Sequence, residues 1–147
     1  MKTLTFSITI SAPKETVWAA LWQEDSFRVW ANFIDEGTYI KGGLQAGNEV
    51  QFLSAVNGYG VTSLVEKLRQ NELLVLRHRA DTKESGQRKR KNEWTGGLER
   101  YTLTENLGIT TLLVEMDTPE ELETVFQQRF PQALACIKKL AEQNESD

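Results

Sequence analysis

With 147 residues, 39% of them hydrophobic and 26% charged, the sequence is predicted to form one globular domain, residues 1–147, around a single core. A formal net charge of −4 argues against nucleic acid or an anionic membrane as the main partner. No apolar run approaches the roughly 20 residues of a membrane span, and the first residues alternate instead of forming a signal-peptide core. We therefore expect no membrane insertion and a cytoplasmic location.

The sequence contains few residues suited to metal or phosphate chemistry. Its one cysteine, Cys136, cannot form an internal disulfide and is expected to be a small packing residue. One cysteine and one histidine, His78, cannot supply a zinc site built from nitrogen and sulfur. Gly96-Gly97 lies in a predicted strand, where a bulge or a close approach is expected instead of a phosphate loop. We expect no metal and no cofactor.

The first third of the chain predicts one strand and two short helices. Residues 3–11 alternate apolar and polar side chains strictly, which is typical of a half-buried antiparallel strand. Residues 13–23 read as a helix opened by Pro13, and residues 24–30 as a second helix that begins with acids. Three of the four tryptophans fall on these helices and should anchor them against one end of a sheet: Trp18, Trp22 and Trp30.

The middle of the chain predicts a series of hairpins. Asn57-Gly58 is a strong two-residue turn signal, and Gly42-Gly43 marks another turn. Residues 82–93 read as a polar loop whose basic run, Arg88 to Lys91, is expected to be solvated or to face a partner. Six strands are predicted between the turns: residues 34–41, 48–56, 60–69, 73–81, 94–105 and 109–117.

Residues 118–147 predict a long amphipathic helix. Thr118 is the expected N-cap and Pro119 the first helical residue. Pro131 lacks an N–H and should kink the helix, which either bends over a filled core or leaves a gap beneath it. Apolar side chains recur at helical spacing along one face: Leu122, Val125, Phe126, Phe130, Ala133, Leu134, Ile137, Leu140 and Ala141. We predict an α+β fold of order β-α-α-β6-α, in which a curved antiparallel sheet grips this helix.

Several of these segments resemble one known family. Residues 8–21 are similar to the opening of the SRPBCC (START-like, helix-grip) superfamily, Trp30 matches its aromatic residue after the second helix, and residues 43–48 match its Gly-containing hairpin. A branch of this superfamily, the homologues of heat-shock-protein ATPase activators, is resembled by residues 94–103, 108–112 and 130–134. The superfamily includes lipid carriers, plant hormone-binding proteins, polyketide cyclases and co-chaperone domains. The resemblance implies a cavity between the long helix and the concave sheet.

The polar candidates for a site lie on two predicted strands and the long helix. By strand parity, His78 shares a face with Leu76, and Glu99 shares a face with Tyr101. An antiparallel pairing of these strands could bring His78, Glu99 and Tyr101 together on the concave side, in surroundings that shift pKa values. Arg129 could receive an anionic head group, pair with Glu99, or extend to solvent. A hydrogen-bonded core histidine is the competing interpretation of His78.

Three functions remain open from the sequence. The first is a protein that binds an apolar or amphipathic small molecule, with His78, Glu99 and Arg129 orienting its polar end. The second is a protein-interaction module like the co-chaperone relatives, monomeric or homodimeric. The third is a cyclase- or dehydratase-like enzyme with His78 and Glu99 as an acid/base pair. The remaining residues predicted to contact a ligand are Phe6, Trp30, Phe52, Leu76, Tyr101, Leu112, Val114, Phe126, Phe130 and Leu134.

Overall fold

The computed structural model describes residues 1–83 and 96–146. Its elements follow the predicted order, with one added 3₁₀ turn before the last helix. They are β1 (Lys2–Ile10), α1 (Lys14–Trp22), α2 (Glu24–Ala31), β2 (Thr38–Lys41), β3 (Glu49–Ser54), β4 (Tyr59–Arg69), β5 (Leu73–Lys83), β6 (Leu98–Asn106), β7 (Ile109–Thr118), the turn η1 (Glu120–Leu122) and α3 (Glu123–Ser146). The predicted α+β order is confirmed.

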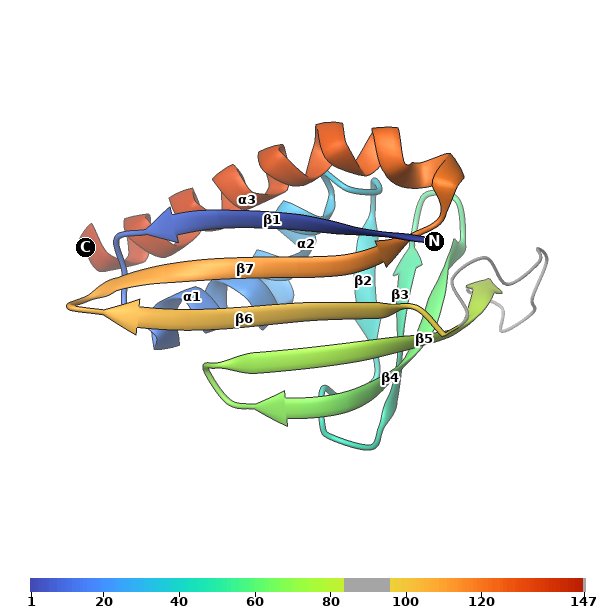
Figure 1. The fold of residues 1–147 in the computed structure, drawn as a ribbon, viewed down its shortest axis with the longest axis horizontal. Helices are drawn as coiled ribbons and strands as arrows, with labels where there is room; N and C mark the ends of the chain where they lie inside the picture. The colour runs from blue at the N-terminus through green and yellow to red at the C-terminus, as the bar shows by residue number, and fades with distance from the viewer. Residues whose placement is uncertain (84–95, 147) are drawn as a thin grey trace.

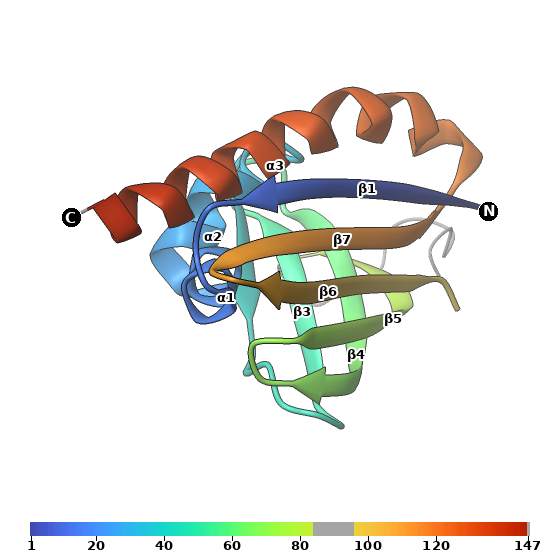
Figure 2. The same ribbon diagram turned by 60° about the vertical axis from the view of Figure 1, so that its left-hand side comes forward.

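The seven strands form one antiparallel sheet in the order β1-β7-β6-β5-β4-β3-β2. The sheet is strongly curved, so β2 and β3 run across the direction of β1 and β7 (Figure 1). Helix α3 lies along the β1 side of the sheet, while α1 and α2 lie at one end of it (Figure 2). Within the described residues, no helix is long and apolar enough to cross a membrane.

Helix α3 is also tied to β1, which is an edge strand of the sheet. Lys138 donates from Nζ to the carbonyl oxygen of Thr9 at 3.0 Å, and Glu142 accepts the Ser11 N–H at 2.8 Å. These bonds occupy backbone groups at the end of a strand whose outer side has no neighbouring strand among residues 1–83 and 96–146. The long helix therefore covers this edge of the sheet as well as part of the core.

Pro131 divides α3 into two parts with different surroundings. Both views show the helix bent instead of straight, as the proline predicts (Figures 1 and 2). After the proline, the side chains that face the sheet are buried: Ala133, Leu134, Ile137 and Ala141. Before it, Leu122, Val125 and Phe126 border a cavity. Both outcomes considered for the bend thus occur, one on each side of Pro131.

Three boundaries differ from the sequence prediction by four residues. Strand β6 begins at Leu98 instead of residue 94, so Gly96-Gly97 precedes the strand, and Gly96 adopts a φ of +87°. Thr118 is not an N-cap; it ends β7, and its hydroxyl donates to the carbonyl oxygen of Met116 at 3.3 Å. The chain passes through η1 before α3 begins at Glu123, so the predicted start at Pro119 is four residues early. Residues 34–37 turn instead of extending β2, because Gly37 adopts a φ of +80° there. The predicted basic run at residues 88–91 lies outside the described residues.

Asp117 joins the start of β6 to β1 through hydrogen bonds. Its Oδ2 accepts the Leu98 N–H at 3.0 Å, and its Oδ1 accepts the Thr3 hydroxyl at 2.7 Å. Burial alone would raise the pKa of Asp117, but these two bonds and the nearby His78 outweigh it and hold the pKa below its ordinary value of 3.8. The ionised carboxylate therefore stabilises the folded chain.

We expect Asp117→Asn to lower the free energy of unfolding by about 1 kcal/mol at about pH 6, because an amide oxygen accepts less strongly than a carboxylate. The folded pKa lies below the unfolded one, so the contribution of Asp117 is complete above about pH 5 and disappears as the pH falls through the folded value. Urea unfolding at about pH 6 and about pH 2.5 should therefore show the difference between wild type and variant narrowing in acid. A difference that stays constant would contradict this account.

Candidate functional site

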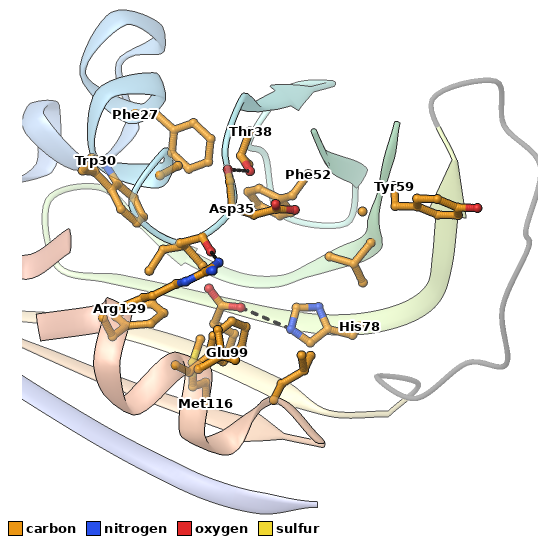
Figure 3. Close-up of a pocket in the computed structure, with 18 of the residues that line it drawn as sticks. Phe27, Trp30, Asp35, Thr38, Phe52, Tyr59, His78, Glu99, Met116 and Arg129 are labelled. Atoms are coloured by element: carbon orange, nitrogen blue, oxygen red, sulfur yellow. Dashed lines mark hydrogen bonds and ion pairs between the residues drawn. The ribbon is translucent and has the colours of Figure 1, made fainter. Parts of the chain in front are cut away.

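A cavity of about 590 Å³ lies between the concave sheet and the first half of α3. Its volume falls in the range of small-molecule sites, about 300 to 1,000 Å³. Most of its wall is apolar and includes four phenylalanine side chains: Phe27, Phe52, Phe126 and Phe130. Figure 3 shows that the wall combines residues of α2, the strands and α3 around a few polar groups.

Eight of the thirteen predicted contact residues border this cavity: Trp30, Phe52, His78, Glu99, Tyr101, Phe126, Arg129 and Phe130. The structure places the other five in the packed core: Phe6, Leu76, Leu112, Val114 and Leu134. Four of these five are 3% exposed or less, and Phe6 stacks on Phe130 with ring centroids 5.0 Å apart. Strand parity identifies which residues face inward, but it does not say which inward positions α1, α2 or α3 cover. The sequence therefore cannot separate these core residues from those that border the cavity.

The predicted cluster of His78, Glu99 and Tyr101 does form. Leu74 lies opposite Tyr101 and Leu76 opposite Glu99, so His78 is two positions further along β5 and diagonal to Glu99. Its Nε2 is 3.2 Å from Glu99 Oε1, and the Tyr101 hydroxyl donates to Glu99 Oε2. The contact between His78 and Glu99 is drawn in Figure 3.

Ser63 completes this cluster on the side away from the cavity. Its Oγ is 2.7 Å from His78 Nδ1, so both ring nitrogens of His78 face polar partners. Ser63 is fully buried and His78 is 2% exposed, while the side chain of Glu99 is 17% exposed and borders the cavity. Glu99 is thus the residue of this cluster that is best placed to contact a ligand. Ser63 is placed to orient the imidazole and not to act as a nucleophile.

Ser63 was missed because β4 and β5 do not pair evenly. The register shifts between Thr62 and Ser63, where Thr62 pairs with Ala80 but Ser63 pairs with His78. Such an irregularity places one extra residue, Arg79, on β5 and changes which side chains share a face beyond it. No turn residue or motif in this part of the sequence signals the shift, so simple strand alternation could not have paired Ser63 with His78.

Tyr101 remains a neutral hydrogen-bond donor at the floor of the cavity. Burial, followed by the neighbouring carboxylate of Glu99 and the hydrogen bond to it, raises the pKa of Tyr101 well above its usual value of 10. The Trp22 ring packs edge-on against the Tyr101 ring, with ring centroids 4.9 Å apart. The phenol therefore keeps its proton directed at Glu99.

Other polar groups of the wall lie toward α2 and α3. Arg129 is exposed and donates from Nη1 to the carbonyl oxygen of Ile34 at 2.8 Å, instead of pairing with Glu99 (Figure 3). Asp35 and Thr38, which sequence reasoning did not select, also border the cavity. The Thr38 hydroxyl donates to the Asp35 carbonyl oxygen at 2.6 Å. Within the described part of the chain, no group of three or more His, Cys, Asp or Glu residues could hold a metal ion.

Several proteins of known structure share this arrangement of helices and strands. Protein MLL2253 from Mesorhizobium loti superimposes with a TM-score of 0.75 at 16% identity, over 97% of this chain and 98% of that one. The Aha1 dimer from Colwellia psychrerythraea gives a TM-score of 0.70 at 16% identity, over 97% of each chain. The chain has the helix-grip fold.

The helix-grip fold is shared with proteins of different kinds. The di-domain ARO/CYC StfQ from the steffimycin biosynthetic pathway gives a TM-score of 0.66 at 14% identity, over 97% of this chain and 46% of that one. At such identities the likeness shows the fold alone. No family model matches the sequence, and no curated protein matches it either. The function must therefore be argued from the cavity itself.

Proposed function

We propose that this helix-grip chain binds a small molecule with a largely apolar body in the cavity between the concave sheet and the first half of α3. The observation that carries the proposal is a hollow of about 590 Å³ whose wall is mainly aromatic and aliphatic. A cavity of this size lined by phenyl rings gains free energy when an apolar ligand removes its surface from water, by about 25 cal/mol per Å². Part of that gain is offset by ordering the ligand.

The polar residues support a ligand with one polar end. His78, Glu99 and Tyr101 are connected to one another at one place in an otherwise apolar wall. A few convergent polar groups in such a wall orient a bound molecule, because a ligand that leaves them unpaired loses affinity. An amphipathic ligand therefore fits the cavity better than a pure hydrocarbon.

Acid/base catalysis is the second candidate, because the contact between His78 and Glu99 lies beside the cavity. His78 has only 2% of its surface exposed, and its two nitrogens face Ser63 and Glu99, which leaves it poorly placed to reach a substrate proton. Glu99 would have to act alone. A ligand that is recovered chemically unchanged after long incubation with the protein would support binding. A product that forms with the folded protein but not with the heat-denatured protein would support catalysis.

The cavity is tested by filling it. We expect Val125→Trp, which adds an indole on the α3 side of the wall, to weaken binding of the neutral dye Nile red at least tenfold, or about 1.4 kcal/mol. Val29→Trp makes the same change on α2 at a residue that is 49% exposed and outside the cavity wall, and should leave affinity unchanged. Fluorescence titration measures both. Equal affinities in the two variants would show that the dye binds elsewhere.

Native mass spectrometry of freshly purified protein is the direct test for the natural ligand. Mass that is present in the native spectrum and lost on denaturation would reveal a bound molecule and its chemical class. Saturable Nile red binding that Val125→Trp weakens at least tenfold would support the cavity even when the native spectrum shows no bound mass. The absence of both would overturn the proposal.

A further inference from the structure

The charges and hydrogen-bond acceptors of the cavity wall also restrict the polar end of the ligand, if the proposed function holds. Glu99 is the carboxylate that projects into the cavity from β6. Asp35, near the end of α2, is the other acidic residue of the wall (Figure 3). The cationic residue Arg129 also borders the cavity, but it is exposed on α3 and donates to the Ile34 carbonyl oxygen. At the cluster of His78, Glu99 and Tyr101, the wall therefore presents a carboxylate to a ligand.

Two donor groups already face Glu99. The Tyr101 hydroxyl donates to Glu99 Oε2, and His78 Nε2 faces Glu99 Oε1 at 3.2 Å. Farther along the wall, the Thr38 hydroxyl donates to a backbone carbonyl at 2.6 Å, and Arg129 Nη1 does the same at 2.8 Å. A ligand acceptor placed at the cluster would have to compete with Glu99 for the Tyr101 hydroxyl.

Glu99 still has capacity to accept. The two oxygens of a carboxylate offer about four lone-pair directions, and the two contacts with His78 and Tyr101 use about half of them. The remaining directions belong to a carboxylate whose side chain is 17% exposed and borders an apolar cavity. A hydrogen bond formed there is strong because the acceptor is charged and the surroundings are poor in water.

We infer that the cavity selects ligands whose polar end donates hydrogen bonds, a hydroxyl or an ammonium group, and rejects ligands that end in a carboxylate. A hydroxyl or ammonium at this point donates to Glu99 and leaves the bonds of Tyr101 and His78 intact. A ligand carboxylate would face Glu99 at close range in a medium of low polarity, where the repulsion between two like charges is strong. This selection deepens the proposed function, because it specifies the chemical class that the same cavity takes.

Three ligands with the same chain test the inference at neutral pH: 1-decanol, decylamine and decanoate, each displacing Nile red. We expect decanol and decylamine to bind at least tenfold more tightly than decanoate. The comparison of decylamine with decanoate decides, because both are ionised and both lose hydration on entering the cavity. The order of decanol and decylamine distinguishes a hydroxyl ligand from an ammonium ligand. Decanoate binding as tightly as both of the others would overturn the inference and would favour a head group at Arg129.

Variants assign the selection to one residue. Glu99→Gln replaces the carboxylate by a neutral amide and should reduce the preference for decylamine over decanoate to less than threefold. Glu115→Gln removes the same charge from β7, on the side of the sheet opposite the buried Val114 and Met116, and should leave the preference unchanged. A preference that survives Glu99→Gln would overturn the role of Glu99. The wild-type comparison remains decisive if that variant does not fold.

The failure of this inference is distinct from failure of the proposed function. If all three ligands displace Nile red but decanoate is as tight as the others, the cavity binds small molecules and the assigned selectivity is wrong. If none displaces the dye and Val125→Trp has no effect on it, the cavity does not bind such ligands and both proposals fail.

Discussion

Gly60→Ala is expected to lower the stability of the protein by about 3 kcal/mol or more, and its Tm by about 10 °C. Gly60 lies in β4, opposite Leu53 of β3, and it also borders the cavity. A methyl group on its Cα would lie 1.8 Å from the carbonyl oxygen of Phe52 and 2.8 Å from the Cα of Leu53. Both are backbone atoms, so no side chain can rotate away and the two strands must separate.

Gly43→Ala is the matched control for this prediction. Gly43 lies in the loop between β2 and β3, and a methyl group there meets nothing nearer than the Asn48 amide nitrogen at 3.9 Å. It should change the free energy of unfolding by less than about 0.5 kcal/mol. Thermal and urea unfolding of both variants measure the difference. A Gly60→Ala protein as stable as wild type would show that the two strands do not approach so closely.

The change at Gly60 should also reach the cavity. The carbonyl oxygen of Phe52 lies closest to the added methyl group, and Phe52 also borders the cavity. Val61, which pairs with Phe52 from β4, borders the cavity as well. Movement of β3 away from β4 would displace both side chains. We therefore expect the folded fraction of Gly60→Ala to bind Nile red more weakly than Gly43→Ala does.

The sequence predicts this fold well because its periodicities are long and consistent. Strict alternation in the first strand, Asn57-Gly58 at a hairpin, and apolar side chains at helical spacing before and after Pro131 all point to the same architecture. The start of α3 is different. A hydroxyl followed by Pro119 and acids is also compatible with a strand that ends in a 3₁₀ turn, and only the pairing of Thr118 with Lys2 decides between them.

The candidate site could be predicted only in part, and the reason is geometric. His78, Glu99 and Tyr101 were found because antiparallel neighbours on the same face lie close together. Ser63 was not found, because it reaches His78 through a register shift that local sequence does not encode. Which apolar residues border the cavity depends on where α3 bends away from the sheet. Leu134 follows Pro131 and is buried in the core, whereas Phe126 precedes it and borders the cavity.

Phe130→Ala is expected to lower the free energy of unfolding by about 3 to 5 kcal/mol, the range for removing a buried aromatic side chain. Phe130 immediately precedes Pro131 and is 2% exposed. Its ring stacks on Phe6, with ring centroids 5.0 Å apart, and meets the ring of Phe126 edge-on, with centroids 6.1 Å apart, so it links β1 to the first half of α3. Thermal unfolding should show the loss directly.

Phe126→Ala is the control that separates the role of the Phe130 ring in the core from its place in the cavity wall. Both phenylalanines border the cavity, but Phe126 is only partly buried and should cost about 1 to 2 kcal/mol. If Phe130 holds α3 against the sheet, its removal opens the core toward the cavity, and the variant should accept ligands too large for the wild type. Equal losses of stability in the two variants would mean that Phe130 holds α3 against the sheet no more firmly than Phe126 does.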